Sequence, residues 1–575
     1  MKRKYSKIKG LLLLSLLTCW GCAIGPKTET SDRSYLNHYN VQHEVIALHA
    51  GIASASPLAS KVGLYILQQG GNAVDAAIAV QLALAVVYPQ AGNIGGGGFM
   101  VMHLADGTNR ALDFREKAPV SARKDMYLDE KGNPVSVKSL AGHLASGVPG
   151  TIAGIFESLC YAKLPFPKLI QPAIDLADKG YLIEPGITDD IGTVDSKYNT
   201  MPNVFDGTHH WKTGETFKQT DLANTLKRIR DHGRKEFYEG ETARLIVEEM
   251  KRGGGNITLQ DLKSYEAVWR EPLTFSYRGY QMVSMPLPSS GGILLNEMLK
   301  MIEPYPVGSY GFGSTQAIGL MVEAERRAYK DRAAYLGDGD FSDIPVKKLT
   351  NDVYLKTQMS DYIQGQAGVS KSLGTGKQQT ESMETTHFSI VDKDGNAVSV
   401  TTTLNMQYGS QVVVGKAGFL LNNEMNDFSL KPGTHNASGG MGGTHNSIEP
   451  GKRMLSSMTP TIVFKNNKVV VVVGSPGGTT IPTSVFQTIV DIIDFKMTAA
   501  DAITKPKFHH EWLPDVVEIE DGFSAETLAG LQKAGYSIST VHGSIGRVEL
   551  IKVNEYGQLD IVADTRGRSD TSEGY

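Results

Sequence analysis

The hydrophobic and polar positions near the start of the chain predict two consecutive helices. Residues 57–90 read PLASKVGLYILQQGGNAVDAAIAVQLALAVVYPQ, two apolar stretches separated by Gly70 and Gly71. Glycine commonly ends a helix because it adopts the left-handed conformation without strain, and Asn72 is a favourable N-terminal cap for the second helix. That second stretch is apolar on nearly all sides, so we expect its helix to be buried.

A glycine-rich loop and strands follow the helical pair. GNIGGGGFMVMHLADG, residues 92–107, reads as a loop that leads into a strand, and ALDFREKAP, residues 111–119, reads as a strand that ends in charged residues. From about residue 165 to 335 the pattern is mostly helical. The polar segment at 365–384 reads as an exposed linker.

Strand patterns return after the linker. Apolar runs rich in β-branched residues predict strands within 418–423, 459–478, 516–520 and 548–564. Further helices are predicted at 485–495 and 524–535. A strand-rich region flanked by helices indicates stacked sheets between helical layers.

The segment from Met383 to Asn405, METTHFSIVDKDGNAVSVTTTLN, has the pattern of a β-hairpin with a tight turn at 394–396. Two threonines, Thr385 and Thr386, begin its first strand directly after the polar linker. Because successive side chains of a strand alternate between its faces, we expect these two threonines to point in opposite directions.

The position of Thr385 raises a chemical possibility. A threonine hydroxyl is a poor nucleophile inside a chain, but an N-terminal threonine can use its own α-amine, with a pKa of about 7.7–8.0, as the base. A chain cut between Glu384 and Thr385 would produce such a residue. The hairpin sequence taken alone favours the simpler interpretation, in which Thr385 merely begins a strand.

The first 22 residues read as a targeting segment. MKRKYSKIKG is basic, and the apolar run LLLLSLL is too short to span a bilayer. Cys22 after Gly21 resembles a lipoprotein cleavage site, so we expect cleavage before Cys22, a polar tether at 23–40, and location in the periplasm or cell envelope with a lipid on Cys22. Plain secretion is the alternative. Cleavage removes Cys19 and Cys22 would carry the lipid, so Cys160 alone would be left for pairing and no disulfide framework is expected.

Composition and short motifs exclude several classes of function. The net charge of −4 over 575 residues gives no basic signature of nucleic-acid binding. Residues 121–124 and 212–214 match the S-x-x-K and K-T-G motifs of serine β-lactamases, but no S-D-N lies between them. The acidic turn at 392–396 lacks the glycine and terminal glutamate of a calcium loop, and residues 509–511 lack zinc-ligand spacing. GNIGGGGF follows a helix rather than a strand, so it is no dinucleotide fingerprint. None of these patterns indicates a metal or an organic cofactor.

Nine motifs, taken in order, resemble those of the γ-glutamyltranspeptidases, a family of N-terminal-nucleophile hydrolases. The resemblance runs from about residue 45 to residue 575. The motifs read GGNAVDAAIA, GNIGGGGFM, LDFREKAP, GVPGT, PLPSSGG, TTHFSIVDKDGNAVSVTTTLN, LLNNEMNDFS, RMLSSMTPTIV and GSPGG. The resemblance implies an α/β fold, a four-layer αββα sandwich with two stacked, mainly antiparallel sheets. It also implies self-cleavage between Glu384 and Thr385 into a large subunit, 41–384, and a small subunit, 385–575, which form one domain as a heterodimer.

The resemblance also implies roles for individual residues. Thr385 would be the nucleophile with its α-amine as base, and Thr403 would orient it. Two backbone N–H groups, those of Gly477 and Gly478, would form an oxyanion hole. The substrate-binding residues would be Arg115, Ser456 and Ser457 for a carboxylate, and Asn405, Glu424 and Asp427 for an ammonium group.

The implied reaction transfers the γ-glutamyl group of glutathione or another γ-glutamyl amide to water, an amino acid or a peptide. Rivals with the same fold are a cephalosporin-type acylase and a poly-γ-glutamate depolymerase. Arg115 together with Glu424 and Asp427 favours a zwitterionic substrate end over both. A non-catalytic, uncleaved binding protein is the rival of another class. The intact Thr385 and Thr403, together with the pair Gly477 and Gly478, argue against it. The sequence departs from many bacterial relatives at Ser438, where a lid tyrosine is expected.

Overall fold

The fold is built on two sheets that pack face to face. The computed structural model describes residues 41–183, 191–370, 385–432 and 442–575. All of them belong to the compact unit Tyr35–Tyr575. Within this part of the chain each main sheet has seven strands, and all neighbouring strands of these sheets are antiparallel.

The first sheet carries the predicted hairpin at its centre. Its strands, in spatial order, are β19 (Thr571–Gly574), β2 (Gly51–Ser54), β10 (Thr385–Val391), β11 (Ala397–Thr403), β3 (Gly97–His103), β4 (Asn109–Asp113) and β7 (Val268–Arg270). The hairpin β10–β11 pairs residue by residue from Thr385 opposite Thr403 to Val391 opposite Ala397. The predicted hairpin is therefore confirmed.

The second sheet covers the inner face of the first. Its strands, in spatial order, are β1 (Glu44–Ala47), β18 (Leu559–Val562), β17 (Glu549–Val553), β13 (Lys468–Gly474), β12 (Thr461–Lys465), β9 (Tyr280–Ser284) and β8 (Leu273–Tyr277). Apolar side chains from both sheets, including Phe99, Val101, Ile462, Val472 and Ile551, form the core between them.

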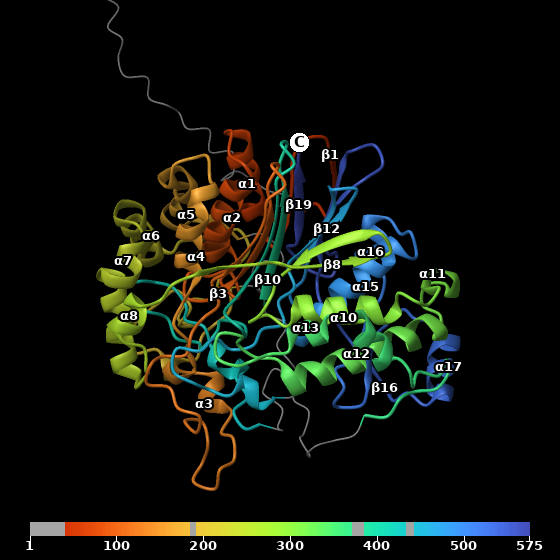
Figure 1. The fold of residues 1–575 in the computed structure, drawn as a ribbon. Coiled ribbons are helices and arrows are strands. Elements are labelled where there is room, and N and C mark those ends of the chain that lie inside the picture. The colour runs from red at the N-terminus through yellow and green to blue at the C-terminus, as the bar shows by residue number, and fades with distance from the viewer. Residues whose placement is uncertain (1–40, 184–190, 371–384, 433–441) are drawn as a thin grey trace, which may run out of the picture. The chain divides into compact units, whose positions relative to one another are not determined.

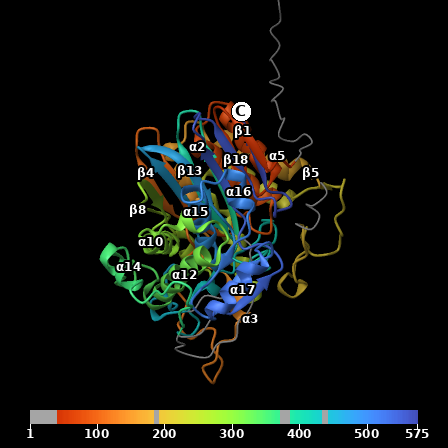
Figure 2. The same cartoon turned by 90° about the vertical axis from the view of Figure 1, so that its right-hand side faces the viewer.

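Helices cover the outer faces of both sheets. On the first sheet lie α1 (Pro57–Gln68) and α2 (Ala73–Val87), backed by α4 (Thr151–Ser158), α5 (Phe166–Lys179), α6 (Thr220–His232), α7 (Arg234–Glu239) and α8 (Glu241–Gly253) (Figure 1). On the second lie α10 (Gly291–Ile302), α12 (Thr315–Tyr335), α15 (Ile481–Ile493) and α16 (Ala499–Thr504), and Figure 2 shows α15 and α16 over β13 and β18. The predicted αββα sandwich is confirmed.

The remaining described elements are short. The helices are α3 (Val137–Leu140), α9 (Leu259–Lys263), α11 (Val307–Tyr310), α13 (Val346–Leu349), α14 (Asp352–Gln358) and α17 (Ala525–Ala534). Small sheets are formed by β14 (Phe508–His509), β15 (Val517–Glu520) and β16 (Ile538–Val541), and by β5 (Tyr181–Leu182) and β6 (Thr216–Phe217). Within the described residues, no helix combines the length and apolar character needed to cross a membrane.

The predicted helical pair forms as expected. The Asn72 side chain accepts the N–H groups of Val74 and Asp75, and Asp75 accepts the Asn72 N–H in return, which completes a capping box. Every residue of α2 is buried, because the helix packs between α1, α5 and the first sheet. This burial explains why its sequence lacks a polar face.

Two sequence predictions are wrong. Residues 268–284 lie in the stretch read as mostly helical but form β7, β8 and β9, which pair with β4 and β12. Residues 418–423 were expected to be a strand but make only an isolated bridge, between Leu420 and Val413. There the Asn422 side chain bonds to the backbone of Gly95 and Gly147, so this buried segment pairs with loops instead of a sheet.

Candidate active site

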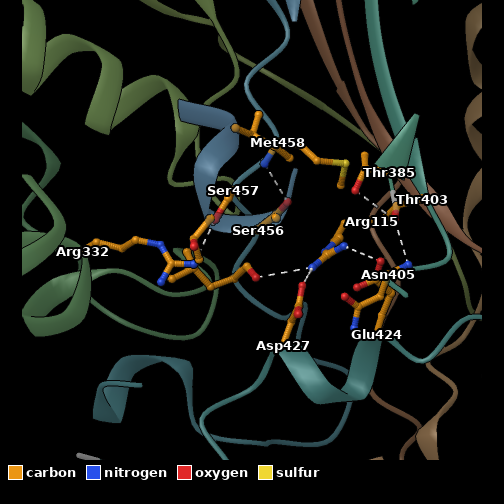
Figure 3. Close-up of a pocket in the computed structure, with 14 residues that line it drawn as sticks. Arg115, Arg332, Thr385, Thr403, Asn405, Glu424, Asp427, Ser456, Ser457 and Met458 are labelled. Carbon is orange, nitrogen blue, oxygen red and sulfur yellow. Dashed lines mark hydrogen bonds and ion pairs between the residues drawn. The ribbon is translucent and has the colours of Figure 1, made fainter. Parts of the chain in front are cut away.

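A pocket lies where the hairpin β10–β11 begins. It is lined by Thr385, Thr403, Asn405, Arg115, Glu424, Asp427, Ser456, Ser457 and Gly478 from the predicted set, and by Arg332, Leu455, Met458, Thr479 and Ile481 (Figure 3). The structure therefore brings the predicted site residues together from segments more than 300 positions apart. Among the predicted residues, Gly477 adjoins the lining residue Gly478, and Glu384, Cys22 and Ser438 lie outside the described residues.

The two hairpin threonines of the pocket contact each other directly. The Thr385 hydroxyl donates to Thr403 Oγ1 at 3.3 Å, and the Asn405 N–H donates to the same oxygen at 2.7 Å. Thr386 pairs with Thr402 and does not line the pocket, so the tandem threonines point to opposite faces as predicted. Within the described residues, Thr385 Oγ1 bonds to this hydroxyl and to no imidazole, carboxylate or amine.

The glycine-rich loop after α2 holds the end of β11 in place. The Asn93 amide donates to the Thr403 carbonyl at 2.9 Å and to Thr402 Oγ1 at 3.1 Å. A Cβ on Gly96 would lie 2.1 Å from the Thr403 carbonyl oxygen, so a side chain there would push the loop away. The glycines of GNIGGGG thus permit a close backbone approach to the strand that carries Thr403.

Arg115 follows β4 and is buried, with 1% of its surface exposed. Its Nη1 lies 2.9 Å from Glu424 Oε1 and its Nη2 lies 2.5 Å from Asp427 Oδ2. These two acids begin and end the 3-10 helix Glu424–Asp427, in which residues three apart lie on one face. The residues predicted to bind opposite ends of a substrate are therefore paired with one another in this structure.

A third acid adjoins the same guanidinium. Glu116 Oε2 lies 3.6 Å from Arg115 Nη1, and the Glu116 side chain is fully buried. Burial raises the pKa of Glu116 to about 8, and burial likewise raises the pKa of Glu424 well above its usual range. Arg115 opposes both shifts, because its positive charge favours the ionised carboxylates, and the three acids share this one guanidinium.

The serine pair lies beside Arg115 and is held by a second motif. The Ser456 carbonyl accepts the Ser290 N–H at 2.7 Å, and the Ser456 N–H donates to the Pro288 carbonyl at 3.0 Å. Ser456 Oγ accepts the Met458 N–H at 3.1 Å. The sequence motifs PLPSSGG and RMLSSMTPTIV are therefore structural partners.

The glycine pair occupies the turn between β13 and α15. Gly477 has φ +132 and Gly478 has φ +58, and a Cβ on Gly477 would lie 2.5 Å from Thr480 Oγ1. The short 3-10 helix Gly478–Thr480 runs directly into α15, so the positive end of the helix faces the turn. Backbone N–H groups at a helix N-terminus are suited to bind a developing oxyanion.

His387 is the imidazole nearest to Thr385 in sequence on the same strand face, two residues along β10. Its Nδ1 lies 2.9 Å from Thr401 Oγ1 and its Nε2 lies 3.1 Å from Ser389 Oγ. Burial lowers the pKa of His387 to about 3, so the ring is neutral at ordinary pH. Since both nitrogens bond to other hydroxyls, His387 is not placed to activate Thr385.

Sequence reasoning missed Arg332, Leu455, Met458, Thr479 and Ile481. Three of these, Leu455, Met458 and Thr479, are sequence neighbours of predicted site residues. That adjacency is the one feature of the sequence that could have identified them. Arg332 lies in the charged run EAERRAYKDRAAY, within the stretch predicted to be mostly helical, and no motif there marks it as a site residue. Within the described residues, no group of three or more His, Cys, Asp or Glu side chains is arranged to hold a metal ion.

Comparison with known proteins points to one family. The family model described as gamma-glutamyltranspeptidase matches residues 59–574. A protein of Escherichia coli named glutathione hydrolase proenzyme is 45% identical over 567 residues, which cover 97% of each chain.

Two solved structures extend the comparison to the fold. The crystal structure of a cephalosporin acylase from Bacillus halodurans superimposes with a TM-score of 0.81 at 26% identity and covers 94% of this chain and 98% of that chain. The structure of gamma-glutamyltranspeptidase from Helicobacter pylori is 43% identical, with a TM-score of 0.52, and covers 58% of this chain and 95% of that chain.

Proposed function

The chain belongs to the gamma-glutamyltranspeptidase family, and from this premise we propose that it is a glutathione hydrolase and γ-glutamyltransferase that matures by cutting itself before Thr385. It then transfers the γ-glutamyl group of glutathione or another γ-glutamyl amide to water, an amino acid or a peptide. The single observation that carries the proposal is the 3.3 Å contact between the Thr385 and Thr403 hydroxyls inside a pocket that contains Arg115 and two acids.

Self-cleavage begins with the Thr385 hydroxyl. Its oxygen attacks the Glu384 carbonyl carbon, the bond from that carbon to the Thr385 nitrogen breaks, and the nitrogen takes a proton. Water hydrolyses the resulting ester and leaves a Glu384 carboxylate and a free Thr385 amine. Since β10 fixes the Thr385 backbone beside β11, the attacking group is already positioned, which lowers the entropic cost of the reaction.

The acyl transfer uses the same oxygen. The new α-amine takes the proton from Thr385 Oγ1 as the oxygen attacks the γ-carbonyl carbon, and the backbone N–H groups of Gly477 and Gly478 donate to the oxyanion. The bond from the γ-carbonyl carbon to the substrate nitrogen breaks, the protonated α-amine returns its proton to the departing amine, and a γ-glutamyl ester remains on Thr385. Water or an acceptor amine then attacks this ester and regenerates the hydroxyl.

Substrate recognition follows from the charges of the pocket. A γ-glutamyl group ends in a carboxylate and an ammonium, and the pocket offers Arg115 and two serine hydroxyls beside Asn405, Glu424 and Asp427. The ammonium can replace Arg115 as a partner of the two acids, while a carboxylate enters on the serine side. A glutaryl or cephalosporin-type side chain would leave the acids without this partner.

The strand order supports a lasting heterodimer after cleavage. In the first sheet β2, from the large subunit, lies between β19 and β10, which both belong to the small subunit. In the second sheet β1 and β9, from the large subunit, flank four strands of the small subunit. Separation of the subunits would break both sheets, so residues 41–384 and 385–575 stay together. We further propose export to the periplasm or cell envelope, with a lipid on Cys22.

The decisive experiment measures both the cleavage of the chain and the activity of the purified enzyme. Purified enzyme should appear as two chains, and the smaller should begin Thr-Thr-His-Phe. It should hydrolyse γ-glutamyl-p-nitroanilide and form γ-glutamyl-dipeptide when a dipeptide is added. An enzyme that prefers glutaryl-p-nitroanilide would be an acylase instead, and an uncut, inactive chain would be a binding protein. Ser438, where a lid tyrosine is expected, lies outside the described residues. From its presence in the sequence we predict that hydrolysis remains substantial with acceptor present.

A further inference from the structure

Arg332, which sequence reasoning missed, reaches the pocket from α12. Its side chain is nearly buried, with 9% of the residue exposed, and Figure 3 shows its guanidinium directed toward the serine pair. Arg332 Nη2 donates to Ser457 Oγ at 3.1 Å, and Nε donates to Ser290 Oγ at 3.3 Å. Both partners are neutral hydroxyls.

The charge of Arg332 is not compensated by an acid in the described part of the chain. On the same helix, Arg326 and Arg327 both pair with Glu323, and each also reaches a second acid. Arg332 makes no such ion pair within those described residues, although a nearly buried cation normally has an anionic partner. Among the described residues that line the pocket, Arg332 is therefore a cation with no carboxylate within ion-pair distance.

Arg115 is less able than Arg332 to attract a substrate carboxylate. Its guanidinium already faces Glu424, Asp427 and Glu116. A carboxylate that entered the pocket would meet an arginine whose charge the protein has largely balanced. Arg332 lies on the other side of Ser457 and would attract that carboxylate without competition from a protein acid.

The hydrogen bonds of Arg332 also fix the direction of the serine hydroxyls. A guanidinium donates hydrogen bonds and accepts none. Since Ser457 Oγ accepts from Arg332, its own hydrogen must point to another acceptor. Ser456 Oγ accepts the Met458 N–H in the same manner, so both hydroxyl hydrogens are available to donate to a ligand.

We propose that Arg332 is a positioning residue for substrate specificity, which directs the Ser457 hydroxyl toward the α-carboxylate of the γ-glutamyl group and adds an uncompensated positive charge beside it. This inference rests on the proposed function, because it assigns a partner within the same substrate. The other carboxylate that could reach Arg332 is that of the leaving or acceptor peptide.

The test compares substrates and ligands that differ in one carboxylate. Arg332→Gln removes the charge, Arg332→Lys keeps it, and Lys330→Gln removes an exposed charge from the same helix as a matched control. In Arg332→Gln the KM for γ-glutamyl-p-nitroanilide should rise roughly 10- to 100-fold, as for a lost hydrogen bond to a charged group, while kcat changes little. Arg332→Lys should recover part of the loss, and Lys330→Gln should match the wild type.

Inhibition constants show which carboxylate is recognised. L-glutamate should bind Arg332→Gln more weakly by the same factor, whereas isoglutamine, whose α-carboxylate is an amide, should bind both enzymes alike. Equal weakening of both ligands means a merely structural role and overturns the proposal. A raised KM for glutathione with an unchanged KM for γ-glutamyl-p-nitroanilide assigns Arg332 to the peptide carboxylate and also overturns it.

A second variant and a binding measurement keep the proposal testable if Arg332→Gln does not fold or if the wild type is inactive. If Arg332→Gln does not fold, Ser457→Ala should show the same selective loss of L-glutamate over isoglutamine, and its absence contradicts the proposal. If the wild type lacks γ-glutamyl hydrolysis, the proposed function fails. The difference between L-glutamate and isoglutamine in thermal-shift binding then still shows whether Arg332 recognises a carboxylate.

Discussion

The hydroxyl oxygens of Thr385 and Thr403 lie 3.3 Å apart across the first pair of residues in the β10–β11 hairpin. Thr403 Oγ1 also accepts the N–H of Asn405, a residue with φ +76 that turns the chain out of β11. The end of β11 thus fixes the oxygen that we expect to act as nucleophile. No side-chain base bonds to Thr385 within the described residues, so a newly formed α-amine is the base that the chemistry requires.

Thr385→Ala should remain one chain and be inactive, because it lacks the oxygen that attacks in both reactions. Thr385→Ser should still cleave, more slowly, since a hydroxyl remains. Gel electrophoresis and N-terminal sequencing measure the outcome. If Thr385→Ala yields a fragment that begins at residue 385, another protease makes the cut and self-cleavage is wrong.

Thr403→Val should lower kcat roughly 10- to 100-fold, because it removes a hydrogen-bond partner of the nucleophile and keeps the shape of the side chain. Thr403→Ser keeps the hydroxyl and serves as the matched control. Steady-state hydrolysis of γ-glutamyl-p-nitroanilide by the mature enzyme measures the effect. A normal kcat in Thr403→Val would show that Thr385 is oriented without Thr403.

Arg115→Lys should raise KM sharply, because the point charge of a lysine ammonium cannot reproduce the two parallel hydrogen bonds that a guanidinium can donate to the substrate carboxylate. Self-cleavage should survive, since Arg115 binds the substrate end of the pocket. Measurement of KM and of the two bands on a gel separates the two effects. An unchanged KM would remove Arg115 from the substrate site.

Gly477→Ala should lower kcat roughly 10²- to 10³-fold, the usual effect of losing an oxyanion donor. A Cβ at φ +132 would collide with Thr480 Oγ1 and shift the turn that presents the backbone N–H groups. Gly107→Ala is the control, since Gly107 has φ +91 but its added Cβ would meet nothing within 4 Å. Equal kcat values for the two variants would argue against an oxyanion hole at this turn.

Stability should fall as the pH is lowered from about 6.5 toward 3, in part because of His387. Burial depresses the pKa of His387 in the folded state to about 3 from its usual value of 6.5. The unfolded state therefore binds the proton first and is stabilised relative to the folded state as pH falls. In His387→Gln the slope of unfolding free energy against pH should be smaller by up to about 1.4 kcal/mol per pH unit. Urea unfolding at pH 4.5 to 7 measures it, and identical slopes would show that His387 does not contribute.

The sequence by itself determined the local helices and the hairpin, and it identified most residues that line the pocket. Gly70, Gly71 and Asn72 delimit α1 and α2, and the alternating pattern around the turn at 394–396 determines the hairpin, because capping and turn formation depend on neighbouring residues. The ordered motifs also identified the residues that gather in the pocket, from Arg115 to Gly478.

Tertiary structure alone decided how those residues pair. Only the folded chain places Arg115 against Glu424 and Asp427, turns residues 268–284 into strands, and brings Arg332 from α12 to Ser457. These outcomes depend on hydrogen bonds and charges between segments far apart in sequence. A local pattern carries no information on such partners, because burial and the distance between charges exist only after the sheets and helices have packed.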